Sequence, residues 1–442
     1  MKSTYKILCI SIGLMLFFVP NVSLGQNTNH QASIHELIQK RTNQIYDSLV
    51  HIRRQLHQYP ELSGQEKQTA KFIADYLSEL GLEVKTNIGG YGVVGILNTE
   101  KRGKKIAWRV DIDALPMEAA ESFSFVSKNK GVNHMCGHDV HTAIGLGIAN
   151  VLATYRDNIE GTVYFIFQPS EENYKGAKAM ITDGLLDIIK PDEIYAVHIS
   201  PMPSGLVASK ANYLYADYKQ LNITFTSAKP TKPLIDYTKQ AISDLQNVSP
   251  DSKFWDTRNL MDLKIGLGNP NTIFQNYITV SNNFETKINE DKLTVSAFIS
   301  TSSKEKMDSI LFLIRKKIKE SEYADQLEEV NFASDKFVFS PDRANVQNHD
   351  SITLQSLNTI SDIYGKSSAF PLHGVIPDGR GDDFAYFQEK IPGVYFLLGG
   401  SNYEKGVIAM PHAPNFAVDE TCIQSGVEYF SSMIIERINQ SQ

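Results

Sequence analysis

Cysteine is scarce in this chain, with three copies in 442 residues. One of them, Cys9, lies within an apolar run near the N-terminus, so Cys136 and Cys422 remain for the rest of the chain. Small exported scaffolds held together by disulfides contain many more cysteines, and that class of fold is excluded. A single Cys136–Cys422 disulfide stays open as an alternative to a chemical role for Cys136.

Clusters of positive charge are also missing. The formal net charge is −7, and no long run of lysine or arginine occurs. Nucleic acids and anionic membranes bind proteins through such clusters, so neither is expected as a partner. The hydrophobic content of 42% and the charged content of 21% are those of an ordinary globular protein.

Long apolar runs are confined to the N-terminus. The basic stretch MKSTYK precedes the apolar run ILCISIGLMLFFV, and the small residues SLG follow it. This order is typical of a secretory signal peptide, which we place at residues 1–25, and it predicts export to the periplasm or out of the cell. An N-terminal anchor that is not cleaved is the alternative. No later run is apolar enough to cross a bilayer, so no membrane span is expected after cleavage.

Helix-like and strand-like patterns alternate along residues 31–212. Helices are predicted first, ending at Pro60 and Gly81, and strands then alternate with helices. This alternation favours an α/β domain with a mixed, largely parallel sheet. The order at 213–334 is strand, helix, paired strands, helix, which predicts an inserted smaller α+β, ferredoxin-like domain. The α/β pattern returns at 335–442, so the first domain is expected to resume there.

The densest chemistry lies in HMCGHDVH, residues 134–141. A metal site, a cysteine nucleophile and a chance cluster in a packed segment all remain possible interpretations. Cys136 and His138 alternate along an apparently extended segment, where both would face one side. Thiolate and imidazole are ligands of zinc and related ions. A helix is predicted to begin near Asp139, whose carboxylate is expected to cap it rather than bind an ion.

The adjacent Glu171 and Glu172 follow the apolar strand TVYFIFQP. Adjacent side chains at a strand end point apart, so one carboxylate can bind a metal while the other stays free as a general base. His198 is expected at the end of another strand, and His412 in a loop near the C-terminus. On the residues alone, these distant groups are only candidates for the same site.

Seven motifs together resemble the M20 metallopeptidase family, in the order in which that family has them. The most similar branch is that of aminoacylases, hippurate hydrolases and indole-acetyl-amino-acid hydrolases. The motifs are HQYPELSGQE (57–66), RVDIDALPME (109–118), HMCGHDVHT (134–142), FQPSEEN with GAKAMITDG (167–184), AVHISPMPSG (196–205), GRGDDFAYF (379–387) and PHAPNFAVDE (411–420).

The resemblance implies hydrolysis of the amide bond of N-acyl amino acids or related small amides. It implies two divalent metal ions, manganese or zinc, and a general base at Glu171, with Asp113 positioning a ligand. The inserted domain would act as a lid and possible homodimer contact, and the partner would be a small-molecule substrate. His134 and His141 would support the site or pack beside it. The implied metal ligands are Cys136, which would bridge the two ions, His138, Glu172, His198 and His412.

The inserted domain departs from the family pattern. The resemblance implies a lid histidine that polarises the substrate carbonyl, yet no histidine occurs between His198 and His349. Ser300 stands near the place of an expected arginine. Lys229 or Lys232 would replace the histidine as a cation, or both are surface lysines. Two alternatives follow: a dipeptidase or carboxypeptidase of the same fold, and a metal-binding protein with weak or lost turnover.

Overall fold

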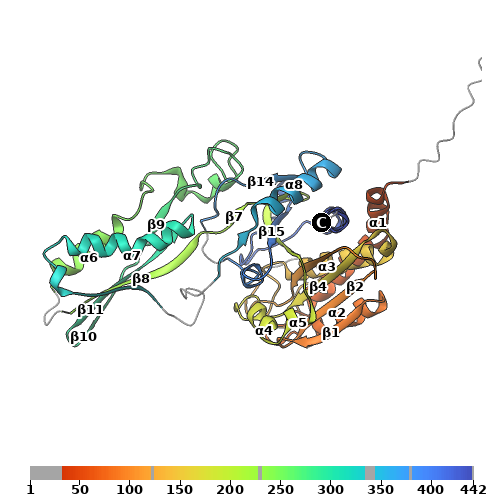
Figure 1. Ribbon diagram of the computed structural model, residues 1–442, viewed down its shortest axis with the longest axis horizontal. Coiled ribbons are helices and arrows are strands. Elements are labelled where there is room, and N and C mark those ends of the chain that lie inside the picture. Colours follow the sequence, from red (N-terminus) through yellow and green to blue (C-terminus); the bar gives the residue numbers. More distant parts are fainter. Residues whose placement is uncertain (1–31, 121–123, 227–230, 334–343, 378–380, 441–442) are drawn as a thin grey trace, which may run out of the picture.

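The computed structural model describes residues 32–120, 124–226, 231–333, 344–377 and 381–440. The chain forms a larger and a smaller unit, each built around its own sheet, and the smaller one extends to the left in Figure 1. The predicted signal peptide at 1–25 and Lys229 lie outside the described residues. Within the described ranges, none of the helices combines the length and the apolar character needed to cross a bilayer.

The larger unit contains a mixed sheet of eight strands in the order β1-β2-β4-β3-β5-β15-β6-β14. The four central strands, β4, β3, β5 and β15, are mutually parallel, and antiparallel pairs occur toward the edges. The strands are β1 (Glu83–Ile88), β2 (Gly92–Asn98), β3 (Lys104–Asp111), β4 (Gly161–Gln168), β5 (Glu193–Pro203), β6 (Val207–Ser209), β14 (Ala369–Pro371) and β15 (Gly393–Ser401). The predicted α/β fold with a mixed, largely parallel sheet is confirmed.

Helices cover both faces of this sheet. On one face α1, α2, α3, α8 and α10 share a continuous apolar core, and on the other α4, α5 and α9 pack on a second core. The central strands are buried on both faces, as parallel strands usually are. The helices are α1 (Ile34–Gln58), α2 (Lys67–Glu79), α3 (His138–Thr154), α4 (Gly176–Thr182), α5 (Leu185–Ile188), α8 (Asp350–Tyr364), α9 (Ala385–Gln388) and α10 (Thr421–Asn439).

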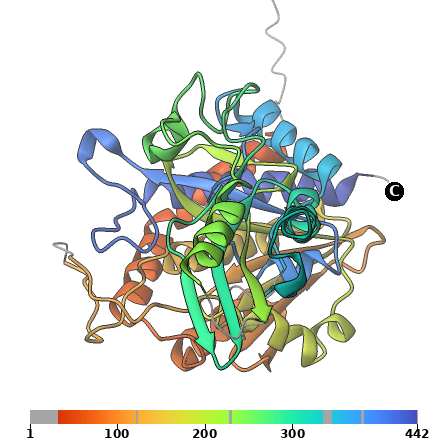
Figure 2. The same ribbon diagram turned by 90° about the vertical axis from the view of Figure 1, so that its left-hand side faces the viewer.

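The smaller unit is an antiparallel sheet in the order β10-β11-β8-β12, with β9 paired to β11. Its helices α6 and α7 pack on one face over a separate apolar core, and Figure 2 shows this unit in front of the larger one. Apart from the additional short strand β9, the order of elements along the chain is that of a ferredoxin-like fold, as predicted. The elements are β8 (Asp217–Thr226), α6 (Lys232–Ser243), β9 (Ile278–Val280), β10 (Glu285–Asn289), β11 (Lys292–Thr301), α7 (Lys304–Lys319) and β12 (Leu327–Phe332).

A segment between α6 and β9 belongs to the core of the larger unit, although it falls within the predicted insertion. Phe254, Phe274 and Tyr277 are buried there together with Leu372 and Val375. The N–H of Val375 donates to the carbonyl of Phe274 at 2.9 Å. The two units are therefore joined by packing as well as by the chain crossovers at β8 and β12.

Candidate metal centre

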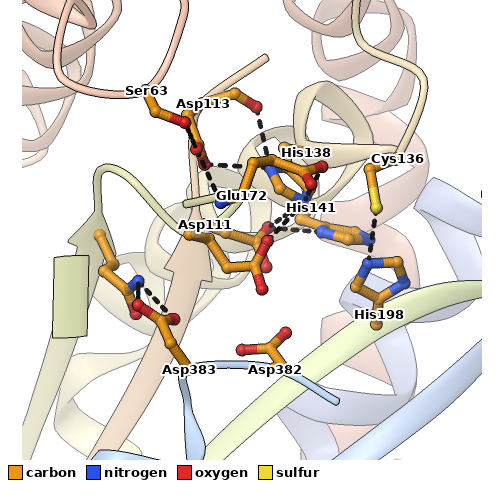
Figure 3. Close-up of polar contacts among 12 residues, drawn as sticks. Ser63, Asp111, Asp113, Cys136, His138, His141, Glu172, His198, Asp382 and Asp383 are labelled. Carbon is orange, nitrogen blue, oxygen red and sulfur yellow. Dashed lines mark hydrogen bonds and ion pairs between the residues drawn. The ribbon is translucent and has the colours of Figure 1, made fainter. Parts of the chain in front are cut away.

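The candidate residues gather where the central parallel strands end, which is where open α/β sheets bind ligands. Asp111 is the last residue of β3, and the turn with Glu171 and Glu172 follows β4. His198 differs from its prediction, because β5 continues to Pro203 and places His198 inside the strand rather than at its end. Figure 3 shows Asp111 and Glu172 close to His138, and Cys136 beside His198, on separate elements.

Cys136 and His138 come together through a turn, so the extended segment that the sequence suggested is wrong. Gly137 has φ of 93°, a left-handed conformation, and His138 is the first residue of α3. A side chain at position 137 would also crowd Ile199 and Phe416 at 3.3 Å, which adds a steric reason for glycine. Cys136 Sγ lies 3.2 Å from Nε2 of His198.

Asp113 fixes the orientation of His138. The Nδ1–H of His138 donates to the main-chain oxygen of Asp113 at 2.8 Å, so the lone pair of Nε2 faces the site. The Asp113 carboxylate accepts a hydrogen bond of 2.6 Å from the Ser63 hydroxyl and one of 3.0 Å from the N–H of Glu172. Burial would raise the pKa of Asp113, but the hydrogen bonds from His138 and Ser63 lower it, which keeps the carboxylate ionised. Asp113 therefore contacts both His138 and the backbone of Glu172, and its positioning role stays a prediction.

Glu171 and Glu172 converge instead of pointing apart. They lie in a turn between two residues with left-handed backbones, Ser170 (φ 57°) and Tyr174 (φ 59°), and not at a strand end. Their carboxylate oxygens lie 3.8 and 3.7 Å from Nε2 of His138. The other oxygen of Glu172 is 3.2 Å from Nε2 of His412.

Glu171 holds its proton more firmly than an ordinary glutamate. Burial raises its pKa well above the usual range, and Asp382 and Glu172 raise it further. A carboxylate of this kind is a better proton acceptor than a solvated one, which suits a general base.

Asp111 and His141 form a pair that the sequence did not assign. Nδ1 of His141 lies 2.6 Å from the Asp111 carboxylate, and Nε2 accepts the N–H of Ile199 at 2.8 Å. Both ring nitrogens of His141 are therefore engaged, and its supporting role stays a prediction, since His141 also lies in a group of possible metal-ligand atoms with Asp111 and His138. Asp111 also lies 3.8 Å from Nε2 of His138. The spacing of Asp111 and Asp113 was visible in RVDID, but nothing in the sequence paired Asp111 with His141.

Arg109 is a second unassigned residue next to the site. It is fully buried and lies 2.6 Å from Asp111 and 3.0 Å from each of Asp382 and Asp383. Oxygens of Asp382 and Asp383 lie within 4.8 Å of one from Glu171. Asp382 and Asp383 were visible in the sequence as part of the motif GRGDDFAYF, but only the structure shows that Arg109 is their buried partner.

Asp139 does not cap α3 as expected. The N-cap residue is Gly137, and the Asp139 carboxylate forms ion pairs of 2.8 Å with Arg53 Nε and with His57 Nδ1. A buried carboxylate needs charged or hydrogen-bonding partners, and Arg53 and His57 supply them here in place of the helix N-terminus. His134 is buried beside His57, with ring centroids 6.4 Å apart, and is not in a described group of metal-ligand atoms.

The alternative disulfide does not form, because Cys136 and Cys422 are both free and buried. Cys422 packs in the apolar core at the start of α10. The thiol of Cys136 is therefore available to bind a metal ion in the candidate centre.

The donor atoms fit a pair of divalent cations that share Cys136. Two groups contain it, and in each group the atoms lie within 4.8 Å of one another. His138 Nε2 and Glu172 Oε1 are buried without a hydrogen-bond partner among the described residues, as expected of atoms that face an ion. The groups are Cys136 with His138 and His198, and Cys136 with Glu172 and His412.

The electrostatics of the site agree with this fit. Burial lowers the pKa of His138, but Asp111, Asp113 and Glu172 outweigh it and raise the pKa to about 10. The surrounding carboxylates thus create a negative potential that favours a bound cation beside His138, and a thiol, imidazoles and carboxylates suit zinc or manganese. All the residues predicted for the site lie together, and their individual roles stay predictions.

Comparison with known proteins agrees with this site. The profile of the peptidase family M20/M25/M40 matches residues 107–436. The chain belongs to this family. It is therefore a hydrolase of the amidohydrolase and peptidase class.

Relatives of this M20 hydrolase differ in what they act on. Thermostable carboxypeptidase 1 of Saccharolobus solfataricus is 30% identical over 416 residues, covering 88% of this chain and 96% of the relative. N-acetylcysteine deacetylase of Bacillus subtilis is 30% identical over 405 residues, covering 88% and 97%. The solved YXEP protein of Bacillus subtilis, a dinuclear metal binding peptidase from the M20 family, has a TM-score of 0.70 and 27% identity, covering 90% of this chain and 99% of that one.

The smaller unit contains none of the metal-ligand groups found among the described residues. Ser300 is 6% exposed within β11, where it pairs with Tyr218 and Thr279. The Lys232 side chain is 86% exposed and pairs with Asp236 on the surface of α6. The surface-lysine interpretation of Lys232 therefore fits the structure better than a catalytic cation.

Proposed function

We propose that this M20 hydrolase cleaves the amide bond of N-acyl amino acids or related small amides, with two divalent ions bound by Cys136, His138, Glu172, His198 and His412. The observation that carries the proposal is the convergence of Glu171 and Glu172 on His138, at 3.8 and 3.7 Å from its Nε2. One glutamate can thus serve as ligand while its neighbour reaches the same reacting centre.

Glu171 performs the proton transfers of the proposed reaction. It takes a proton from the attacking water and delivers it to the departing amine, so that water adds to the carbonyl carbon as the C–N bond breaks. Bound divalent ions supply Lewis acidity, which makes the water more acidic and stabilises negative charge on the carbonyl oxygen. Asp113 holds His138 and the backbone of Glu172 in place throughout. No covalent intermediate with the enzyme is needed.

Cys136 is unsuited to be a nucleophile in this arrangement. Burial raises the pKa of its thiol well above the usual range, and Glu172 and Glu171 raise it further, so the thiolate is not favoured by the protein alone. Its sulfur also belongs to both groups of donor atoms. A ligand role is compatible with both observations, because a bound cation deprotonates the thiol that coordinates it.

Substitution of the general base tests the proposal. Metal-loaded wild type, Glu171→Gln and Glu171→Ala are incubated with acyl-amino acids, dipeptides and amides that lack a carboxylate, and released amine is measured. General acid–base catalysis contributes roughly 10²–10⁴-fold, so both variants are expected to lose at least that much activity. Metal content near that of wild type is the control for an intact site.

Two other functions are outcomes of the same experiment. Preference for dipeptides would favour the dipeptidase or carboxypeptidase alternative, to which the carboxypeptidase relative lends support. A wild type as inert as Glu171→Ala across the whole panel, with metal bound, would replace hydrolysis by metal binding without turnover. The histidine-free smaller unit is the observation that favours this last outcome.

We also propose export, on the N-terminal sequence 1–25, and a homodimer through the smaller unit. Cell fractionation with sequencing of the mature N-terminus tests export, with a start just after residue 25 expected. Light scattering of the purified protein tests the dimer, and a monomeric mass would exclude it.

A further inference from the structure

The loop of residues 60–66 contacts the candidate centre at two points without supplying a ligand. Ser63 donates its hydroxyl hydrogen to the Asp113 carboxylate at 2.6 Å. Glu66 Oε1 accepts the N–H of Gly64 and the N–H of Ser170, each at 2.8 Å. The proposed chemistry uses neither contact, yet Glu66 has an exposed fraction of 0% in a molecule where burying a carboxylate is costly.

Ser170 is the residue whose backbone sets the direction of the two glutamates. Its φ of 57° lies in the left-handed region, which is unfavourable for residues other than glycine. Its carbonyl accepts the N–H of Gly176 at 3.0 Å and that of Lys175 at 3.2 Å, which closes the turn around Glu171 and Glu172. The N–H of the same residue points the other way, to Glu66.

We propose that Glu66 is a positioning residue that holds Ser170 in its left-handed conformation and so directs Glu171 and Glu172 together toward the metal centre. The proposal rests on the proposed function only in taking Glu172 as a ligand. A residue with an unfavourable backbone conformation persists when its surroundings fix it, and such residues cluster at functional sites. The hydrogen bond from Ser170 is the contact that fixes this one.

The contact needs an acceptor oxygen rather than a negative charge. Only Oε1 of Glu66 serves the two N–H groups, and Oε2 is buried without a hydrogen-bond partner among the described residues. Glutamine presents the same acceptor at the same length. Glu66→Gln is therefore expected to keep the turn, whereas Glu66→Met, of similar size, removes the acceptor and leaves the Ser170 N–H unpaired.

Metal affinity measures this effect without any need for turnover. Mn²⁺ and Zn²⁺ are titrated in competition with a chromophoric chelator, and thermal unfolding of the metal-free protein is recorded beside it. Groups that orient metal ligands typically account for about 10–100-fold in affinity, so Glu66→Met is expected to bind that much more weakly. Glu66→Gln is expected to bind as wild type.

Ser170→Gly separates positioning from general damage. Glycine adopts the left-handed conformation without strain, so Glu66→Met/Ser170→Gly is expected to recover much of the affinity that Glu66→Met loses. Glu193→Met is the matched control, since Glu193 is a buried carboxylate at the start of β5 that pairs with Arg437. It is expected to lower the unfolding temperature and leave metal affinity unchanged.

Three results would overturn the proposal: unchanged affinity in Glu66→Met, equal loss in Glu66→Gln and Glu66→Met, or no recovery in the double variant. Where Glu66→Met fails to fold, Ser170→Val takes its place, because a β-branched residue disfavours the left-handed conformation. Unchanged affinity in that variant would also overturn it. The proposed hydrolysis can be wrong while the proposal for Glu66 is right, because metal affinity can be measured even if the wild type cleaves no amide.

Discussion

The two units of this protein have the same kinds of structural elements but differ in how deeply they bury charged side chains. Each is a sheet covered by helices over an apolar core. In the larger unit Arg109, Asp111, Asp113 and His138 are all at most 1% exposed. In the smaller unit most of the described ion pairs are at the surface, as between Lys292 and Glu328, whose side chains are 52% and 35% exposed, and only the pair of Lys219 with Asp217 is largely buried, at 15% and 11%.

The difference follows from strand topology. In the larger unit neighbouring parallel strands end at the same edge, so loops from residues distant in the sequence meet there. In the smaller unit all strands pair antiparallel, so neighbouring strands end at opposite edges of the sheet. The loops that follow these strands are therefore divided between the two edges instead of gathering at one. A constellation of buried ligands therefore finds a place in one sheet and not in the other.

The largest effect is expected on metal binding, when Cys136, the residue common to both donor groups of the larger unit, is replaced. Cys136→Ala deprives both donor groups of a ligand, so metal affinity is expected to fall by more than the roughly 10–100-fold typical of an outer partner. Elemental analysis after dialysis measures it. Ser300→Ala, in the smaller unit, is the control and is expected to keep the metal content of wild type. Unchanged binding in Cys136→Ala would contradict the bridging role.

The second-largest effect is expected on the free energy of unfolding, when Arg109 is removed from its buried ion pairs. Arg109→Met leaves Asp111, Asp382 and Asp383 without their common cation, and loss of one partner of a buried pair typically costs about 3–5 kcal/mol. Urea unfolding of the metal-free protein measures the change. Lys292→Met removes a surface partner of Glu328 and is expected to leave the unfolding midpoint where it is. Equal losses of unfolding free energy in Arg109→Met and Lys292→Met would contradict the difference between buried and surface ion pairs.

The smallest expected effect is a pH dependence of opposite sign in the two units. Burial, with a smaller contribution from Asp113, raises the pKa of Glu66 to about 6. The folded state therefore binds the carboxyl proton more tightly than the unfolded state does. This contribution to the free energy of unfolding is fully present below about pH 4.5 and is lost as the pH rises through about 6. The free energy of unfolding of wild type relative to Glu66→Gln is expected to decrease over that interval.

Asp244 in the smaller unit supplies the opposite slope. The hydrogen bond from Lys317 lowers the pKa of Asp244, so its contribution is present above its ordinary pKa and lost as the pH falls. The difference between wild type and Asp244→Asn is expected to be small, because the pair is exposed. Chemical unfolding between pH 3 and 7 compares both variants with wild type, and slopes of the same sign would refute the comparison.

Much of the fold could be predicted because its signals are local. Apolar periodicity predicted α1 and α2, and the alternation of strands and helices predicted both the parallel sheet and the ferredoxin-like unit. The packing of Phe254, Phe274 and Tyr277 on the larger unit could not be predicted in this way. Their partners lie about a hundred residues away, and apolar residues in an irregular segment do not reveal which core they join.

The sequence by itself determined the family, the fold class and the residue types that gather at the centre, because the motifs carry them in order. Tertiary structure alone decided how those residues face one another. The left-handed backbone at Gly137 and Ser170 turns Cys136, Glu171 and Glu172 inward, where an extended strand would have spread them. Side-chain direction depends on backbone dihedral angles, and at Ser170 the angle is fixed by a hydrogen bond to Glu66, 104 residues earlier in the chain.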